Sequence, residues 1–105
     1  MTEIQIKPLA PIQAGNLTLF RLRFLDEDGV ALDLSSSSDW KIVLSDPSGA
    51  VTVNNAALTT DGSDGMIQAA LTPSLAGTWR VQGRITLDGA TKHSSKGTFA
   101  VEHNL

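Results

Sequence analysis

Most of the chain consists of short runs in which hydrophobic and polar residues alternate. The longest run, TWRVQGRITL at 78–87, changes polarity at nearly every position. A period of two places alternate side chains on opposite faces of a β-strand, so the run predicts a strand with one buried face. It is followed by Asp88-Gly89, a strong hairpin signal. The predicted inward face carries Trp79, Val81, Gly83, Ile85 and Leu87.

A second alternating run, at 16–25, predicts another half-buried strand, with Phe20, Leu22 and Phe24 on its inward face. Turn residues follow at Asp26 to Gly29 and again at Pro47 to Gly49, where a type I turn is expected. No segment keeps helical spacing over ten residues, although 72–77 has room for one helical turn. Further strands are predicted at 3–6, 40–44, 50–60 (interrupted at Asn54-Asn55), 66–71 and 91–102.

This succession of short strands and turns predicts an all-β fold, an antiparallel immunoglobulin-like β-sandwich of seven to eight strands. We expect one domain over 12–105. Residues 1–11 are expected to form an arm or edge strand, because Pro8 and Pro11 disfavour a central strand. The strand of Trp40 should pair with that of Trp79, which should also pair with the last strand. The expected core anchors are Trp40, Trp79, Phe20, Phe24 and Phe99.

Composition narrows the classes of function. Among the 105 residues acidic side chains outnumber basic ones, and the net charge is −3, so no nucleic-acid partner is expected. No apolar run approaches the roughly 20 residues of a membrane span, and no signal-peptide pattern opens the chain, so neither a membrane partner nor export is expected. The chain has no cysteine, which excludes disulfides and thiolate metal sites.

Candidate catalytic and metal-binding residues are few. His93 lies in a predicted strand and His103 near the end of the chain, and neither accompanies a nucleophile motif, so we expect no enzyme. The acidic loops Asp26-Glu27-Asp28 and Asp61 to Asp64 lack EF-hand spacing, so turn chemistry is favoured over calcium binding. We expect no cofactor and no small-molecule substrate.

Basic residues gather on one predicted outer face. Arg80 and Arg84 point outward from the strand at 78–87, and Lys41 and Lys96 are expected to join them if the strands pair as above. A docking face for an acidic neighbour is one interpretation, and arginine is enriched in interface cores. A solvated outer face is the alternative.

The order of motifs resembles a module of tailed-phage structural proteins. The residues concerned are Asp26 to Gly29, Leu32 to Leu34, Pro47 to Gly49, Asp64-Gly65, Ala76 to Trp79 and Asp88 to Val101. They are similar to the N-terminal domain family of phage baseplate upper proteins.

This resemblance implies a virion structural protein without a cofactor, made in the host bacterial cytoplasm. It would act by protein–protein contact as a baseplate, tail or fibre adaptor, or as a capsid decoration protein. Its partners would be other virion proteins, with homo-oligomers possible. The alternative is a carbohydrate- or receptor-binding immunoglobulin-like module. Both tryptophans lie on predicted inward rows, which counts against this alternative.

Overall fold

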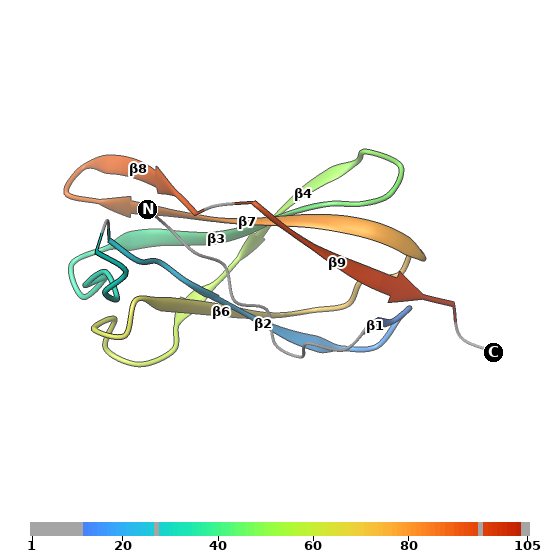
Figure 1. The fold of residues 1–105 in the computed structure, drawn as a ribbon, viewed down its shortest axis with the longest axis horizontal. Helices are drawn as coiled ribbons and strands as arrows, with labels where there is room; N and C mark the ends of the chain where they lie inside the picture. The colour runs from blue at the N-terminus through green and yellow to red at the C-terminus, as the bar shows by residue number, and fades with distance from the viewer. Residues whose placement is uncertain (1–11, 27, 95, 104–105) are drawn as a thin grey trace.

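The computed structural model of the chain describes residues 12–26, 28–94 and 96–103. These ranges contain nine β-strands in two sheets that pack face to face, so the predicted all-β, immunoglobulin-like sandwich is confirmed, with more strands than the seven to eight expected. Figure 1 shows β3 and β7 in one layer and β2 and β6 in the other. The described ranges contain no helix that could cross a membrane.

The larger sheet has six strands. Five of them follow the spatial order β1 (Ile12–Gln13), β9 (Gly97–Glu102), β7 (Gly77–Leu87), β3 (Ser38–Ser45) and β4 (Val51–Asn55), and β8 (Ala90–His93) pairs with the second half of β7. All pairings are antiparallel except that of β1 with β9. The expected pairing of the Trp40 strand with the Trp79 strand, and of that strand with the last one, is confirmed.

The smaller sheet has three strands, in the order β2 (Thr18–Arg23), β6 (Met66–Leu71) and β5 (Ala57–Leu58). The run predicted at 50–60 supplies both β4 and β5, with the break at Ala56 rather than at Asn54-Asn55. Ala56 still donates its N–H to Trp40 of β3, after which the chain moves to the other sheet. The segment at 72–76 forms no helical turn, and the strand predicted at 3–6 lies outside the described residues.

The predicted turns are present. Gly29 donates its N–H to the carbonyl of Asp26 at 3.1 Å. Gly49 donates its N–H to the carbonyl of Asp46 at 3.0 Å, which closes the turn around Pro47. Asp88 and Gly89 have φ angles of 53° and 77°, so both central residues of the β7–β8 hairpin adopt the left-handed conformation of a type I′ turn. The hairpin reverses the chain in two residues and lays β8 against β7.

The core lies between the sheets and contains most of the expected anchors. Phe20, Phe24 and Trp79 are buried, as predicted. Trp40 and Phe99 are only half-buried and pack against the rim of this core. The ring of Phe99 lies 5.0 Å from that of Phe20 and 5.9 Å from that of Trp79, so it links the two sheets. Leu34, which belongs to no strand, is fully buried and was not foreseen.

Candidate functional site

The candidate site is the solvent side of the larger sheet. Strand alternation sends Ile42, Leu44 and Val81 inward, where all three are buried. The residues between them therefore point to the opposite side. We use the term outer face for the side of the larger sheet that carries Lys41, Val43, Ser45, Val51, Val53, Arg80, Gln82, Arg84 and Lys96.

The register brings the predicted basic residues together. Lys41 lies directly opposite Arg84, and Ser45 lies opposite Arg80. Lys41 forms an ion pair with Asp39 at 3.4 Å, and within the described ranges no ion pair engages Arg80, Arg84 or Lys96. Like charges directly opposite each other on a sheet repel. The outer face thus carries basic charge that its own carboxylates do not balance.

Lys96 reaches this face because of a one-residue bulge. His93 pairs with Arg84, and Gly97 pairs with Val81. Gly97 is four residues beyond His93 in the chain, whereas Val81 and Arg84 are only three residues apart, so the β8–β9 side contains one extra residue. Without the extra residue, strict alternation from the exposed His93 would point Lys96 inward and Phe99 outward. A bulge re-aims the side chains that follow it. Here it exposes Lys96 beside Gln82 and directs Phe99 toward the core.

Ser94 fastens the bulge to β7. Its N–H donates to the carbonyl of Gly83 at 2.9 Å, and its hydroxyl accepts the N–H of Gly83 at 2.7 Å. Its carbonyl accepts the side-chain amide of Gln82 at 2.9 Å. Ser94 is buried although it is polar. Sequence reasoning missed this residue, because a serine within the run predicted as one strand at 91–102 carries no signal of such a role.

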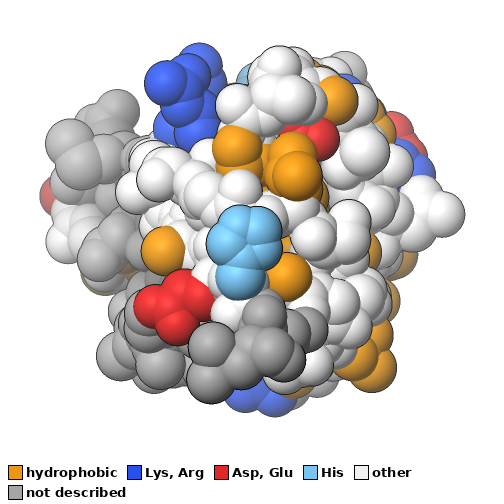
Figure 2. All heavy atoms as spheres, turned by 90° about the vertical axis from the view of Figure 1, so that its right-hand side faces the viewer, with side chains coloured by type: hydrophobic (Ala, Val, Ile, Leu, Met, Phe, Trp, Pro, Cys, Tyr) orange, Lys and Arg blue, Asp and Glu red, His pale blue; other side chains and the backbone are white. Residues whose placement is uncertain are grey.

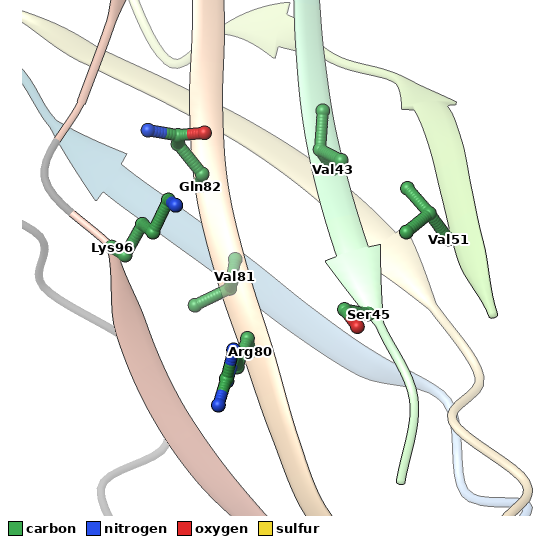
Figure 3. Close-up of a pocket in the computed structure, with 7 residues that line it drawn as sticks. All are labelled: Val43, Ser45, Val51, Arg80, Val81, Gln82 and Lys96. Atoms are coloured by element: carbon green, nitrogen blue, oxygen red, sulfur yellow. The ribbon is translucent and has the colours of Figure 1, made fainter. Parts of the chain in front are cut away.

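A hollow of about 250 Å³ opens on the outer face beside this bulge. Arg80, Gln82 and Lys96 supply its polar lining. In Figure 3 the side chain of Lys96 extends toward β7, across from the valines of β3 and β4. The apolar and hydroxyl part of the lining comes from Val43, Ser45, Val51 and Val81.

Exposed valines continue the apolar lining toward the edge of the sheet. Val51 and Val53 of β4 are 62% and 52% exposed, and Val53 lies directly opposite Val43. Burying exposed aliphatic side chains against a partner lowers the free energy of the complex. The outer face therefore joins an apolar strip on β3 and β4 to a basic strip on β7 and Lys96.

Other surfaces differ from this one. On the smaller sheet Arg21 donates to the side-chain carbonyl of Gln68 at 3.3 Å, and Arg23 contacts the sulfur of Met66 at 3.2 Å. Figure 2 looks at one end of the sandwich, where lysine and arginine side chains lie only at the margins and hydrophobic ones form small groups. On the outer face, by contrast, Arg80, Arg84 and Lys96 have no polar partner among the residues that the structure describes, and they lie next to an apolar strip.

The acidic loops perform the expected turn chemistry. Asp26 accepts the backbone N–H of Asp28 and of Val30, and Asp61 accepts that of Ser63. In the turn at 46–49, Asp46 accepts the backbone N–H of Ser48 and of Ala50 in the same way. The hydrogen bond from the Ser48 side chain is the main reason that the pKa of Asp46 lies below its usual value; burial opposes it, and backbone hydrogen bonds of the turn add to the lowering. Among the described residues no group of three or more His, Cys, Asp and Glu side chains is placed to hold a metal ion.

The two histidines are both exposed. His93 lies on β8 directly opposite Arg84 and adds a third basic side chain to the row formed with Lys41. His103 follows the end of β9. His93 is therefore part of the border of the outer face.

Comparison with known proteins shows the fold. No family model and no curated protein matches the chain. The chain is similar to the crystal structure of CopC from Methylosinus trichosporium OB3b, with a TM-score of 0.63 and 23% identity, over 99% of this chain and 97% of that one.

The resemblance to phage baseplate upper proteins is therefore wrong, and so are the phage virion function and the virion localisation drawn from it. This solved structure, which matches 99% of the chain, is not a virion component. The motifs misled because they are general turn chemistry. Asp26 and Asp46 cap their turns with backbone hydrogen bonds, which any sandwich with such turns can contain.

The carbohydrate-binding alternative also fails. Sugar sites commonly present exposed aromatic rings, and the chain has five aromatic residues in all. Trp79, Phe20 and Phe24 are buried, and Trp40 and Phe99 pack against the core. No ring is left to form a stacking platform. The comparisons thus show a β-sandwich with the fold of CopC and show no family.

Proposed function

We propose that the chain is a non-enzymatic protein-binding domain that uses the outer face as its contact surface. Its partner would present a segment in which carboxylates alternate with aliphatic side chains. Carboxylates would meet Arg80, Arg84 and Lys96, and the aliphatic groups would cover Val51 and Val53. One observation carries the proposal: basic side chains without ionic partners among the described residues share an exposed face with uncovered valines.

Charge supports a partner of this kind. Bringing carboxylates to the outer face would neutralise Arg84, which lies directly opposite Lys41, whereas Lys41 itself already pairs with Asp39. Arginine also forms bidentate hydrogen bonds with carboxylates, which adds geometric selectivity. The acidic residues of the chain itself lie largely in turns, where their oxygens accept backbone N–H groups. Among the described residues, only Asp39 forms an ion pair with this face, through Lys41, and Arg80, Arg84 and Lys96 have no ionic partner.

The size of the hollow supports a protein partner rather than a small molecule. Pockets for small ligands commonly measure about 300–1,000 Å³ and enclose most of the ligand. The hollow measures about 250 Å³ and opens on a sheet face. Such a hollow has room for one or two side chains of a partner whose main contact extends over the neighbouring strands.

The test maps an acidic peptide onto the chain. The probe is an acetylated, amidated peptide of alternating Glu and Val, titrated into isotopically labelled protein and followed by NMR. We expect the chemical-shift changes to concentrate on β3, β4, β7 and Lys96. A matched peptide with Lys in place of Glu should cause no chemical-shift changes there. Shifts concentrated on the smaller sheet, or equal effects of the two peptides, would overturn the proposal.

Metal binding is a second candidate, favoured by the likeness to CopC alone. A metal site needs several donor side chains around one point, and the described residues contain no such group. Thermal unfolding with and without added divalent copper or zinc separates the two candidates. We expect the same midpoint in both conditions, and a metal-dependent rise would favour the second candidate.

A further inference from the structure

Strand β4 forms an open edge of the larger sheet. In antiparallel pairs, hydrogen-bonded and non-hydrogen-bonded positions alternate. Ala56 donates to the carbonyl of Trp40 and Asp46 donates to that of Ala50, so the bonded positions of β4 are the even ones. The N–H and C=O groups of Val51, Val53 and Asn55 therefore point away from β3. Among the described strands, β4 pairs with β3 alone.

This edge lacks the features that usually prevent edge-to-edge pairing. Natural edges are protected by lysines, prolines, bulges or very short strands. β4 has the sequence VTVNN, without charge or proline, and its five residues pair with β3 in an unbroken register. Figure 1 shows β4 beyond β3 at the margin of the layer.

We propose that β4 pairs antiparallel with β4 of a second copy of this chain, about a two-fold axis at Val53. This register uses the open backbone groups on both copies, because bonded positions fall at Val53 with Val53 and at Val51 with Asn55. The two larger sheets would become one continuous sheet. The proposal does not depend on the partner of the outer face.

A second copy fits this edge better than an unrelated strand because the rows of side chains match across the axis. Val43 and Val53 of one copy would be followed by Val53 and Val43 of the other, which makes an unbroken row of β-branched residues. Cross-strand pairs of such residues stabilise sheets. The basic side chains of each copy lie on β7, β3 and the bulge, away from the axis, so the pairing brings no like charges into contact.

The experiment measures association of the full chain by sedimentation equilibrium from about 1 µM to about 1 mM, where weak interfaces change occupancy. We expect a monomer–dimer equilibrium. Hydrogen exchange of the Val53 amide, followed by NMR, should slow as the concentration rises. A monomer at every concentration, or a dimer whose Val53 amide exchanges at the monomer rate, would overturn the proposal.

Substitutions at Val53 test the edge itself. Val53→Pro removes the open N–H and should abolish the dimer, whereas the matched variant Val53→Thr keeps that N–H and a β-branched side chain and should retain it. Val53→Lys should also give a monomer, which keeps the test valid if the proline variant does not fold. Dimers in both the proline and the lysine variants would contradict the edge pairing.

Discussion

The hydroxyl of Ser94 accepts the backbone N–H of Gly83 at 2.7 Å, and both residues are buried. This contact stands where β7 changes partner from β8 to β9. Gly83 faces the bulge, where the regular ladder of backbone hydrogen bonds is interrupted, and the Ser94 hydroxyl provides the acceptor for its N–H. One buried side chain therefore maintains the register that exposes Lys96.

Removing that hydroxyl should destabilise the fold. Ser94→Ala leaves the Gly83 N–H without its acceptor, and a buried unsatisfied donor costs about 1–3 kcal/mol. Urea unfolding measures the difference. The matched control is Ser48→Ala in an exposed turn, which we expect to change stability by less than about 0.5 kcal/mol. Equal effects of the two substitutions would contradict the role of Ser94.

Gly83 should not tolerate a side chain, because Phe24 and Leu22 fill the space above it. A Cβ at this position would lie 3.0 Å from Cζ of Phe24 and 3.1 Å from Cδ1 of Leu22. Both neighbours are fully buried, so the two sheets must separate slightly to admit it. We expect Gly83→Ala to cost about 1–3 kcal/mol of unfolding free energy, in the range for overpacking. Thr78→Ala, at an exposed position of the same strand, serves as the control.

The two tryptophans should differ in their contribution to stability. Trp79 is buried, stacks on Phe99 and donates its indole N–H to the carbonyl of Leu75 at 2.7 Å. Trp79→Ala should cost roughly 3–5 kcal/mol, the range for emptying a large core site. Trp40 is half-buried, so Trp40→Ala should cost less. A loss for Trp40→Ala equal to or greater than that for Trp79→Ala in urea titrations would contradict this ranking of the anchors.

Acid should weaken the turns. The pKa of Asp46 lies below its ordinary value of 3.8, first because the Ser48 hydroxyl donates to the carboxylate at 2.6 Å. A carboxyl whose folded pKa is depressed contributes stability above its unfolded pKa and loses it as the pH falls toward the folded pKa. We expect the melting temperature to fall below about pH 4. An NMR titration of Asp46 should show its pKa rising toward 3.8 in Ser48→Ala, and an unchanged pKa would exclude the hydroxyl as its main cause.

Local patterns predicted most of the fold. Strict alternation at 78–87 and the turn residues at 46–49 and 88–89 correspond to β7 and to two turns seen in the structure. These signals are local, so a single sequence contains them. Leu34 was missed because it is buried from a loop, where no period marks the inward side.

The bulge marks the limit of the same reasoning. The last strand was predicted as one run at 91–102, and Phe99 was assigned to the core. That assignment is right only because an extra residue between His93 and Gly97 shifts the alternation. The extra residue shows only in the pairing of β7 with its two neighbours. The pairing of β7 with β8 and β9 cannot be read from one sequence. The surroundings of Lys96 and the role of Ser94 could therefore not be predicted.

The measurement that tests the central claim most directly compares two charge reversals. Arg80→Glu places a negative charge beside the hollow on the outer face, and Arg21→Glu makes the same change at an exposed position of the smaller sheet. The affinity of each variant for the Glu–Val peptide is measured by NMR titration. We expect Arg80→Glu to weaken binding by about tenfold or more, equivalent to about 1.4 kcal/mol, and Arg21→Glu to leave it within about twofold. Equal affinities of the two variants would contradict the outer face as the contact surface.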